Sequence, residues 1–353
     1  MVNVVITGGA GFLGSRLARE LLAAGSLEVA GGEARPLSRV TLIDQAPVPP
    51  DLAADERVTA VRGDLAQLLD PAAAGPDTLA IGGIGDIWGE AEVIFHLAAA
   101  VSGECEADFD LGIRANLRAT EALLASCRAL GTSPLVVFSS SLAVFGGSAD
   151  HPLPAVVDDQ TLPNPQTSYG AQKVIGEQLL ADYTRKGFLR GRALRLVSIS
   201  VRPGRPNAAA SGFMSGIIRE PLAGQRATCP VTPDTEVALA SPAKAIAGLR
   251  CAAAASDQAW GGRSAVNLPA LTISVADMAA ALARIAGPQV SALIDWIPDA
   301  EVARMVASWP ARVRADRADQ LGLTPDPDFD SIIRMHLAES GSEAAAAAES
   351  DRA

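Results

Sequence analysis

The glycine pattern after the first apolar segment constrains the fold of this chain most. A β-branched run ends at Thr7, and the next residues read Gly8-Gly9-Ala10-Gly11-Phe12-Leu13-Gly14 before a helical pattern. Gly8 permits a tight turn, Gly11 lets a phosphate approach the backbone, and Gly14 lets a helix pack closely on the strand. Because a helix N-terminus offers free N–H groups to phosphate, this strand, turn and helix predict a dinucleotide-binding unit.

Apolar runs typical of strands alternate with helical patterns through the first half of the chain. We expect strands at residues 2–7, 39–43, 58–61, 93–97 and 134–139. Helical patterns lie between them, for example at 15–24 and 117–130. Repeated strand–helix–strand order predicts an α/β fold with a doubly wound parallel (Rossmann) sheet. The Gly-rich segments 25–38 and 71–90 are long for connections in such a sheet, so we interpret them as surface excursions.

The composition changes after residue 200, where prolines punctuate the sequence. Helical patterns return at residues 275–286, 300–307 and 329–337. We therefore expect a dinucleotide-binding domain over 1–200 with returns at about 234–268, a smaller mixed substrate-binding cap over 201–233 and 269–340, and a disordered or frayed tail over 341–353.

The bulk composition excludes several classes of function. A formal charge of −11 opposes non-specific nucleic-acid binding, which depends on Lys and Arg. No apolar run reaches the roughly 18–20 residues that span a bilayer, so we expect no membrane association. The four cysteines lack Cys-x-x-Cys spacing and the three histidines are far apart, so we expect no metal site. The N-terminus reads as a strand rather than a signal peptide, which favours a cytoplasmic location.

Acidic residues follow the second and third expected strands. Asp44 can accept hydrogen bonds from both hydroxyls of the adenosine ribose and would repel a 2′-phosphate, which favours NAD over NADP. A solvated turn aspartate is the alternative. Asp64 lies where it can contact adenine or cap a helix. We also expect cofactor contacts from residues in or beside these turns, namely Phe12, Leu13, Leu65 and Ala98.

Tyr169 and Lys173 are spaced by four residues, which places both on one face of a helix. A nearby ammonium stabilises phenolate, so we expect Lys173 to lower the pKa of Tyr169 and to hold the nicotinamide ribose. Tyr169 would then take a hydroxyl proton as hydride leaves for the nicotinamide. Upstream, a strand ends in Ser139-Ser140-Ser141, where a hydroxyl can hold the substrate oxygen.

These motifs together resemble the extended short-chain dehydrogenase/reductases, the NAD-dependent epimerase/dehydratase family. The resemblance covers Val2 to about Pro203 and includes the glycine turn, His96-Leu97-Ala98-Ala99, Asn116, Ser141 and Tyr169-x-x-x-Lys173. It implies NAD as cofactor and Ser141 as the third catalytic group, with Ser140 as the alternative. It also implies a structural or proton-relay role for Asn116, although a helix-surface asparagine fits equally, and it is compatible with a homodimer. His96 is expected to pack beside the cofactor.

Three longer segments resemble a branch of this family that oxidises sugar acids: residues 101–110, 201–213 and 218–222. The resemblance implies NAD-dependent oxidation of a four-carbon sugar acid at its C2 hydroxyl. Such a substrate needs a carboxylate anchor, and Arg219 is our candidate because guanidinium binds carboxylate bidentately. Ser102, Asn207 and Ser211 are candidates for the substrate hydroxyls. A structural ion pair for Arg219 and turn roles for Asn207 and Ser211 are the alternatives.

Two other functions remain open from the sequence. The first is a nucleotide-sugar 4-epimerase of the same fold; a dehydratase is disfavoured because Leu142 and Ala143, not acids, follow Ser141. The second is a non-catalytic NAD-sensing protein, which would not need Tyr169 and Lys173 at helical spacing.

Overall fold

A parallel sheet forms the larger part of the molecule. The computed structural model describes residues 1–69, 88–148, 150–204 and 210–350, the last nine as backbone only. The strands of this sheet run in the order β11-β7-β6-β5-β1-β3, with β4 paired to β3. Their bounds are β1 Val2–Thr7, β3 Arg35–Asp44, β4 Val58–Arg62, β5 Val93–His96, β6 Leu135–Ser141, β7 Arg190–Leu196 and β11 Val266–Asn267. All of these pairings are parallel, which confirms the doubly wound sheet.

The strand order changes direction between β1 and β5. From β1 the chain builds outward through β3 and β4, and it then returns to β5 on the other side of β1. Such a reversal leaves a crevice beyond the carboxyl ends of the two central strands, which is where ligands bind in open α/β sheets. The glycine turn after Thr7 and the segment after His96 border this crevice.

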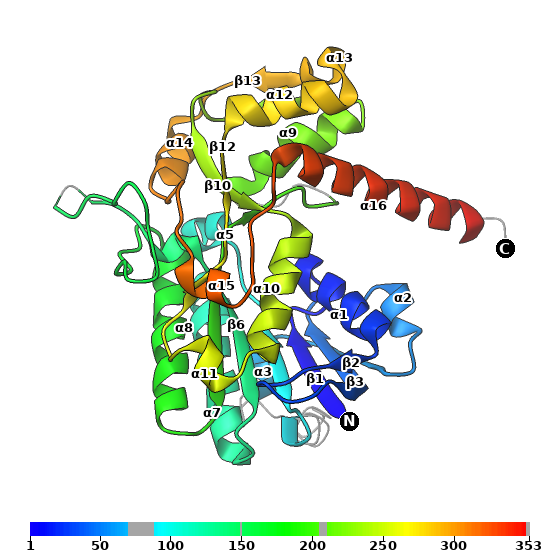
Figure 1. Ribbon diagram of the computed structural model, residues 1–353, viewed down its shortest axis with the longest axis vertical. Coiled ribbons are helices and arrows are strands. Elements are labelled where there is room, and N and C mark those ends of the chain that lie inside the picture. The colour runs from blue at the N-terminus through cyan, green and yellow to red at the C-terminus, as the bar shows by residue number, and fades with distance from the viewer. Residues whose placement is uncertain (70–87, 149, 205–209, 351–353) are drawn as a thin grey trace.

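Helices cover both faces of the sheet, as Figure 1 shows. Val4 and Ile6 of β1 pack with α1 (Phe12–Ala24) and α10 (Pro242–Ala254), whereas Val5 packs with α7 (Ala119–Leu130) and α8 (Ser168–Arg185) on the other face. Because side chains alternate along a strand, a continuous run of apolar residues is required when both faces are buried. This explains why the central strands lack the alternation of a half-exposed sheet.

The excursion expected at residues 25–38 is partly ordered. β2 (Ser26–Leu27) pairs antiparallel with the start of β3, which begins at Arg35 rather than near residue 39 as we expected. The N–H groups of Ala30 and Gly31 donate to the carbonyls of Ala253 and Ala254 and so fasten the excursion to α10. Most of the second excursion, residues 70–87, lies outside the described residues.

A second group of elements forms the cap seen at the top of Figure 1. Its sheets contain β8 Ser198–Ile199, β10 Glu236–Ala240 and β12 Leu271–Ser274, and β9 Ala227–Cys229 with β13 Ile294–Trp296. Its helices include α9 Phe213–Leu222, α12 Val275–Ala286, α13 Pro288–Ser291 and α14 Ala300–Ala307. Residues such as Ile217, Leu282 and Ile333 give the cap a hydrophobic core of its own.

The remaining elements are short, except for the last helix. They are α2 Pro50–Ala53, α3 Leu65–Leu69, α5 Ser102–Ala107, α6 Phe109–Gly112, the π-helical η1 Ile113–Arg118, η2 Leu142–Val144, η3 Ala210–Gly212, α11 Asp257–Trp260 and α15 Asp316–Gln320. Helix α16 (Phe329–Ser350) continues into the segment where we expected a disordered or frayed tail, and Arg16 of α1 pairs with its Glu339. No helix in the described ranges is long and apolar enough to cross a bilayer.

Candidate active site

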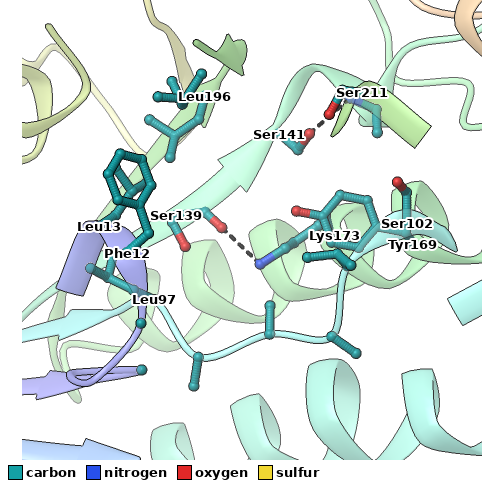
Figure 2. Close-up of a pocket in the computed structure, with 18 of the residues that line it drawn as sticks. Phe12, Leu13, Leu97, Ser102, Ser139, Ser141, Tyr169, Lys173, Leu196 and Ser211 are labelled. Carbon is teal, nitrogen blue, oxygen red and sulfur yellow. Dashed lines mark hydrogen bonds between the residues drawn. The ribbon is translucent and has the colours of Figure 1, made fainter. Parts of the chain in front are cut away.

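One cavity of about 660 Å³ extends from the glycine turn to the cap. The carboxyl ends of β1, β3, β5 and β6 border it on the side of the sheet, and Leu196, Met214 and Trp309 line it where the cap begins. Figure 2 shows Tyr169 and Lys173 projecting from α8 toward the end of β6, with Phe12 and Leu13 across the cavity. The cavity therefore brings most of the candidate residues to one place.

The glycine turn closes one end of the cavity and fits a dinucleotide. Gly8 has a φ of +71°, and a Cβ there would lie 2.8 Å from the Ala98 nitrogen. A Cβ on Gly14 would lie 2.1 Å from the Gly8 oxygen, so helix α1 packs against the turn only because that position is glycine. Gly8, Gly11 and Gly14 all line the cavity, as do Phe12 and Leu13. Backbone without side chains is what a pyrophosphate needs in order to reach the helix N-terminus.

Asp44 lies at the end of β3, as expected for a residue that binds the adenosine ribose. One carboxylate oxygen accepts from the Ala10 N–H at 3.0 Å and the other from the Ala46 N–H at 3.0 Å. Each oxygen has a second lone pair for a ligand hydroxyl. Asp44 thus joins the glycine turn to the strand end, and the residues present fit NAD.

Asp64 caps a helix, which is one of the two roles that the sequence left open, and its contact with adenine stays a prediction. Its carboxylate accepts from the Ala66 N–H at 2.9 Å and so caps α3, and the residue also lines the cavity. Leu65 and Ala98 line the same cavity. The Ala98 N–H donates to the Thr7 hydroxyl at 3.3 Å, which holds the segment after β5 against β1.

Lys173 is buried between α8 and β6. Its ammonium donates to the Ser139 carbonyl at 2.9 Å and lies 4.8 Å from the centre of the Phe138 ring. Burial lowers the pKa of Lys173 to about 8. The Lys173 nitrogen is also 5.6 Å from the centre of the Tyr169 ring, so the two side chains share one face of α8 as their spacing predicts.

The pKa of Tyr169 departs from our expectation. Burial raises the pKa of Tyr169 to about 12, and the opposing effects come from a hydrogen bond with Ser141 and from the positive charge of Arg202. The expectation that Lys173 lowers this pKa is therefore wrong for the protein alone, because desolvation of the phenolate dominates. The nearby arginine was not anticipated from the sequence.

The three serines at the end of β6 have different surroundings. Ser139 donates to the His96 carbonyl at 3.1 Å, and Ser140 donates to the buried carboxylate of Glu177 at 2.5 Å. Ser141 is the one whose hydroxyl interacts with Tyr169, and it also accepts from the Ala143 N–H at 3.1 Å. All three serines line the cavity, and Ser141 is the one whose hydroxyl meets Tyr169.

His96 and Asn116 form a buried polar layer behind the cavity. His96 Nδ1 lies 2.7 Å from the Thr7 hydroxyl and Nε2 lies 2.9 Å from the Thr120 hydroxyl, which itself donates to the Asn116 carbonyl. Because the Thr120 hydroxyl donates its proton to the Asn116 carbonyl, it can only accept from His96. Nε2 of His96 therefore carries the proton and donates to Thr120, and Nδ1 accepts from the Thr7 hydroxyl. Burial lowers the pKa of His96 to about 3, so the ring is neutral and structural. The Asn116 side chain bonds both backbone groups of Ala100.

The substrate end of the cavity differs most from the expectation. Ser102 and Ser211 line it, and Ser102 also accepts from the Ala210 N–H at 3.4 Å. Asn207 lies outside the described residues. Arg219 does not line the cavity: its guanidinium donates to the Arg202 carbonyl at 2.7 Å and pairs with Glu220. The side chain at this end of the cavity that carries a guanidinium is instead Arg202.

Comparison with known proteins agrees with this geometry. Residues 4–238 match the description "NAD dependent epimerase/dehydratase family", which spans the glycine turn, Ser141, Tyr169 and Lys173. The chain belongs to that family. Its members depend on NAD, and the cradle formed by the glycine turn and Asp44 fits this cofactor.

Relatives within the epimerase/dehydratase family match over nearly the whole chain. D-erythronate dehydrogenase of Cupriavidus necator is 49% identical over 96% of this chain and 99% of the relative. D-erythronate dehydrogenase of Haemophilus influenzae is 37% identical over 95% of this chain and 99% of the relative. A solved structure described as the nucleoside-diphosphate-sugar epimerase from Agrobacterium tumefaciens has a TM-score of 0.82 and 39% identity, covering 95% of this chain and 93% of that one. The chain is thus an NAD-dependent enzyme of this family.

Sequence reasoning missed two features of this family member. One is Arg202, whose place in the cavity depends on the fold of the segment after β8. The other is the buried ion pair of Glu177 and Arg195 at 2.8 Å, which lies beneath Ser140. The spacing of Glu177 four residues after Lys173 is a signal for a third residue on that helix face, because residues four apart lie on the same side of a helix.

Proposed function

We propose that this protein oxidises D-erythronate to 2-dehydro-D-erythronate, with NAD as the oxidant and Tyr169 as the base. The observation that carries the proposal is the single cavity lined by the glycine turn, Ser141, Tyr169, Lys173 and Arg202. The substrate identity is supported by the two nearly full-length relatives named D-erythronate dehydrogenase.

Each polar group in the cavity has a distinct role in this proposal. Ser141 and Tyr169 hold the C2 hydroxyl of the substrate, and the phenolate form of Tyr169 takes its proton. NAD bound in the cradle of the glycine turn and Asp44 would supply the hydride acceptor for C2, and the C2 alcohol would become a ketone. Lys173 holds the nicotinamide ribose, whereas the hydrogen bond from Ser141 and the positive charge of Arg202 favour phenolate over phenol.

The buried polar layer keeps this arrangement in place. Because the Lys173 ammonium is fixed to the Ser139 carbonyl, the end of β6 and helix α8 cannot separate without breaking a charged hydrogen bond. The segment after β5 is held in the same way by Asn116, which bonds both backbone groups of Ala100. The substrate therefore meets groups that are already oriented. Such preorganisation is the source of much of the rate enhancement in active sites of this kind.

A nucleotide-sugar 4-epimerase is the second candidate, because the Agrobacterium tumefaciens relative carries such a description. The lining of the cavity disfavours it. The cavity of about 660 Å³ holds one guanidinium, that of Arg202, among its described lining residues, and we expect a small acid rather than a nucleotide sugar beside NAD.

Purified protein should separate the two candidates in one assay. We expect NADH to accumulate, followed by absorbance, when the protein is supplied with NAD and D-erythronate, and not with UDP-glucose or UDP-galactose. A panel of four-carbon acids that includes L-threonate then defines the stereochemical preference. Interconversion of the nucleotide sugars without net NADH, together with inert tetronates, would contradict the proposal.

We expect a cytoplasmic enzyme that acts on a small molecule and binds neither nucleic acid nor membrane. A homodimer is compatible with the family, and sedimentation analysis of the purified protein measures it directly.

A further inference from the structure

Arg202 is held in the cavity wall by its own backbone and by its neighbours. Its N–H donates to the Ser215 hydroxyl at 3.0 Å, and its carbonyl accepts from the Arg219 guanidinium at 2.7 Å. Its Nε donates to the Ile199 carbonyl at 3.2 Å. Three contacts therefore fix the residue between the end of β8 and helix α9, and Arg219 serves to position it.

The charge of Arg202 has no acidic partner among the described residues. Arg195 pairs with Glu177 and Arg219 pairs with Glu220, whereas no ion pair within the described residues joins Arg202 to a carboxylate. Arg202 is half-buried, and this partial desolvation lowers the pKa of its guanidinium. A half-buried guanidinium that lines a cavity without a carboxylate partner is available to pair with an anionic ligand.

The groups that surround Arg202 in the cavity suit a small anion that carries several hydroxyls. Arg202 lines the same cavity as Tyr169, and the charges of the two groups act on each other. The hydroxyl-bearing Ser102 and Ser211 line the same end of the cavity. In the described chain, the other guanidinium groups lie outside this cavity wall.

We propose that Arg202 binds the carboxylate of the substrate and selects short 2-hydroxy acids. This inference rests on the proposed function and names the feature of the substrate that the site recognises. The two terminal nitrogens of Arg202 suit a bidentate carboxylate, and Nε already holds the guanidinium in one orientation. In a 2-hydroxy acid the carboxylate is bonded directly to the carbon that is oxidised. Anchoring C1 on Arg202 therefore presents the C2 hydroxyl to Tyr169 and Ser141.

Replacing Arg202 tests this role against neutral substrates. We expect Arg202→Met to lower kcat/KM for D-erythronate by about 100-fold, since a charged bidentate hydrogen bond is lost. Arg202→Lys should lose about tenfold, because it keeps the charge without the second hydrogen bond. The wild type should prefer D-erythronate to D-erythronamide, and Arg202→Met should abolish that preference. The Kd for NAD should change less than threefold in both variants.

A matched control is available in the cap. Arg226 is exposed, pairs with Asp295 and lies outside the cavity, so Arg226→Met should leave all of these values unchanged. Thermal unfolding of each variant shows whether the fold is kept, and guanidinium ion added to Arg202→Ala should restore part of the lost activity.

The outcomes separate this inference from the proposed function. If the wild type produces NADH from D-erythronate but Arg202→Met keeps its preference for the acid over the amide, the carboxylate role is wrong and the dehydrogenase assignment stands. If the wild type produces no NADH with any tetronate, the proposed function fails and takes the carboxylate role with it.

Discussion

Arg195 of β7 and Glu177 of α8 form a buried, two-pronged ion pair directly beneath the end of β6. The Arg195 Nε and a terminal nitrogen donate to the two carboxylate oxygens at 2.9 and 2.8 Å. Both side chains are almost fully buried, and Ser140 donates a third hydrogen bond to the same carboxylate. This cluster links the strand that carries Ser141 to the helix that carries Tyr169 and Lys173.

Removing one partner of this pair should destabilise the protein strongly. We expect Glu177→Gln to lower the free energy of unfolding by about 3–5 kcal/mol, because Arg195 would remain charged and unpaired in the interior. Urea unfolding measures the loss. The control is Asp182→Asn on the same helix, which breaks the exposed pair with Arg185 and should cost less than about 1 kcal/mol. Equal losses in the two variants would refute a special role for the buried pair.

His96 should make the protein sensitive to acid. Its pKa is about 3 in the folded state against an ordinary 6.5, so the unfolded chain binds the additional proton between these values. The contribution of neutral His96 to the free energy of unfolding is fully present above pH 6.5. It is lost as the pH falls from 6.5 toward 3, and the total loss is up to about 5 kcal/mol. Unfolding of wild type and His96→Asn across this range should show a shallower decline in the variant.

The control for this prediction is a histidine on the surface. His151 is exposed, so His151→Asn should follow the wild-type pH profile. A His96→Asn profile parallel to the wild type would mean that the ring does not remain neutral in the folded protein.

Asp44 should determine the preference for NAD over NADP. Asp44→Ser removes both the ribose acceptor and the charge that repels a 2′-phosphate, so we expect the ratio of kcat/KM for NAD to that for NADP to fall about 100-fold. Asp44→Asn is the second variant to compare, because it removes the negative charge but keeps an acceptor oxygen for the Ala10 or Ala46 N–H. Initial rates with both cofactors measure the ratio. An unchanged ratio in both variants would show that selectivity lies elsewhere.

Local sequence signals predicted the sheet and the cofactor end of the site well. The glycine turn, Asp44 at a strand end and the spacing of Tyr169 and Lys173 are each visible as a short local pattern of residue types within an expected strand or helix. The start of β3 was misplaced because its first residues are paired by β2, across an excursion whose sequence does not resemble a strand.

The substrate end depended on contacts that no local pattern reveals. We expected Arg219 as the carboxylate anchor, and only the fold decides that the Arg202 carbonyl accepts from the Arg219 guanidinium while Arg202 lines the cavity. In the same way, Ser140 and Ser141 are distinguished by Glu177, which is distant in the chain. The raised pKa of Tyr169 could not be predicted from the sequence either, because it depends on how fully the fold removes water from the phenol.

The central claim is that the Tyr169 hydroxyl takes the substrate proton, and the two tyrosines of this chain allow a matched test. Steady-state turnover of D-erythronate should fall about 1,000-fold in Tyr169→Phe while the Kd for NAD stays within threefold. Tyr183→Phe, on the same helix but packed against Phe188 and outside the cavity, should behave as wild type. Turnover by Tyr169→Phe within tenfold of the wild type, with NAD bound normally, would contradict the account.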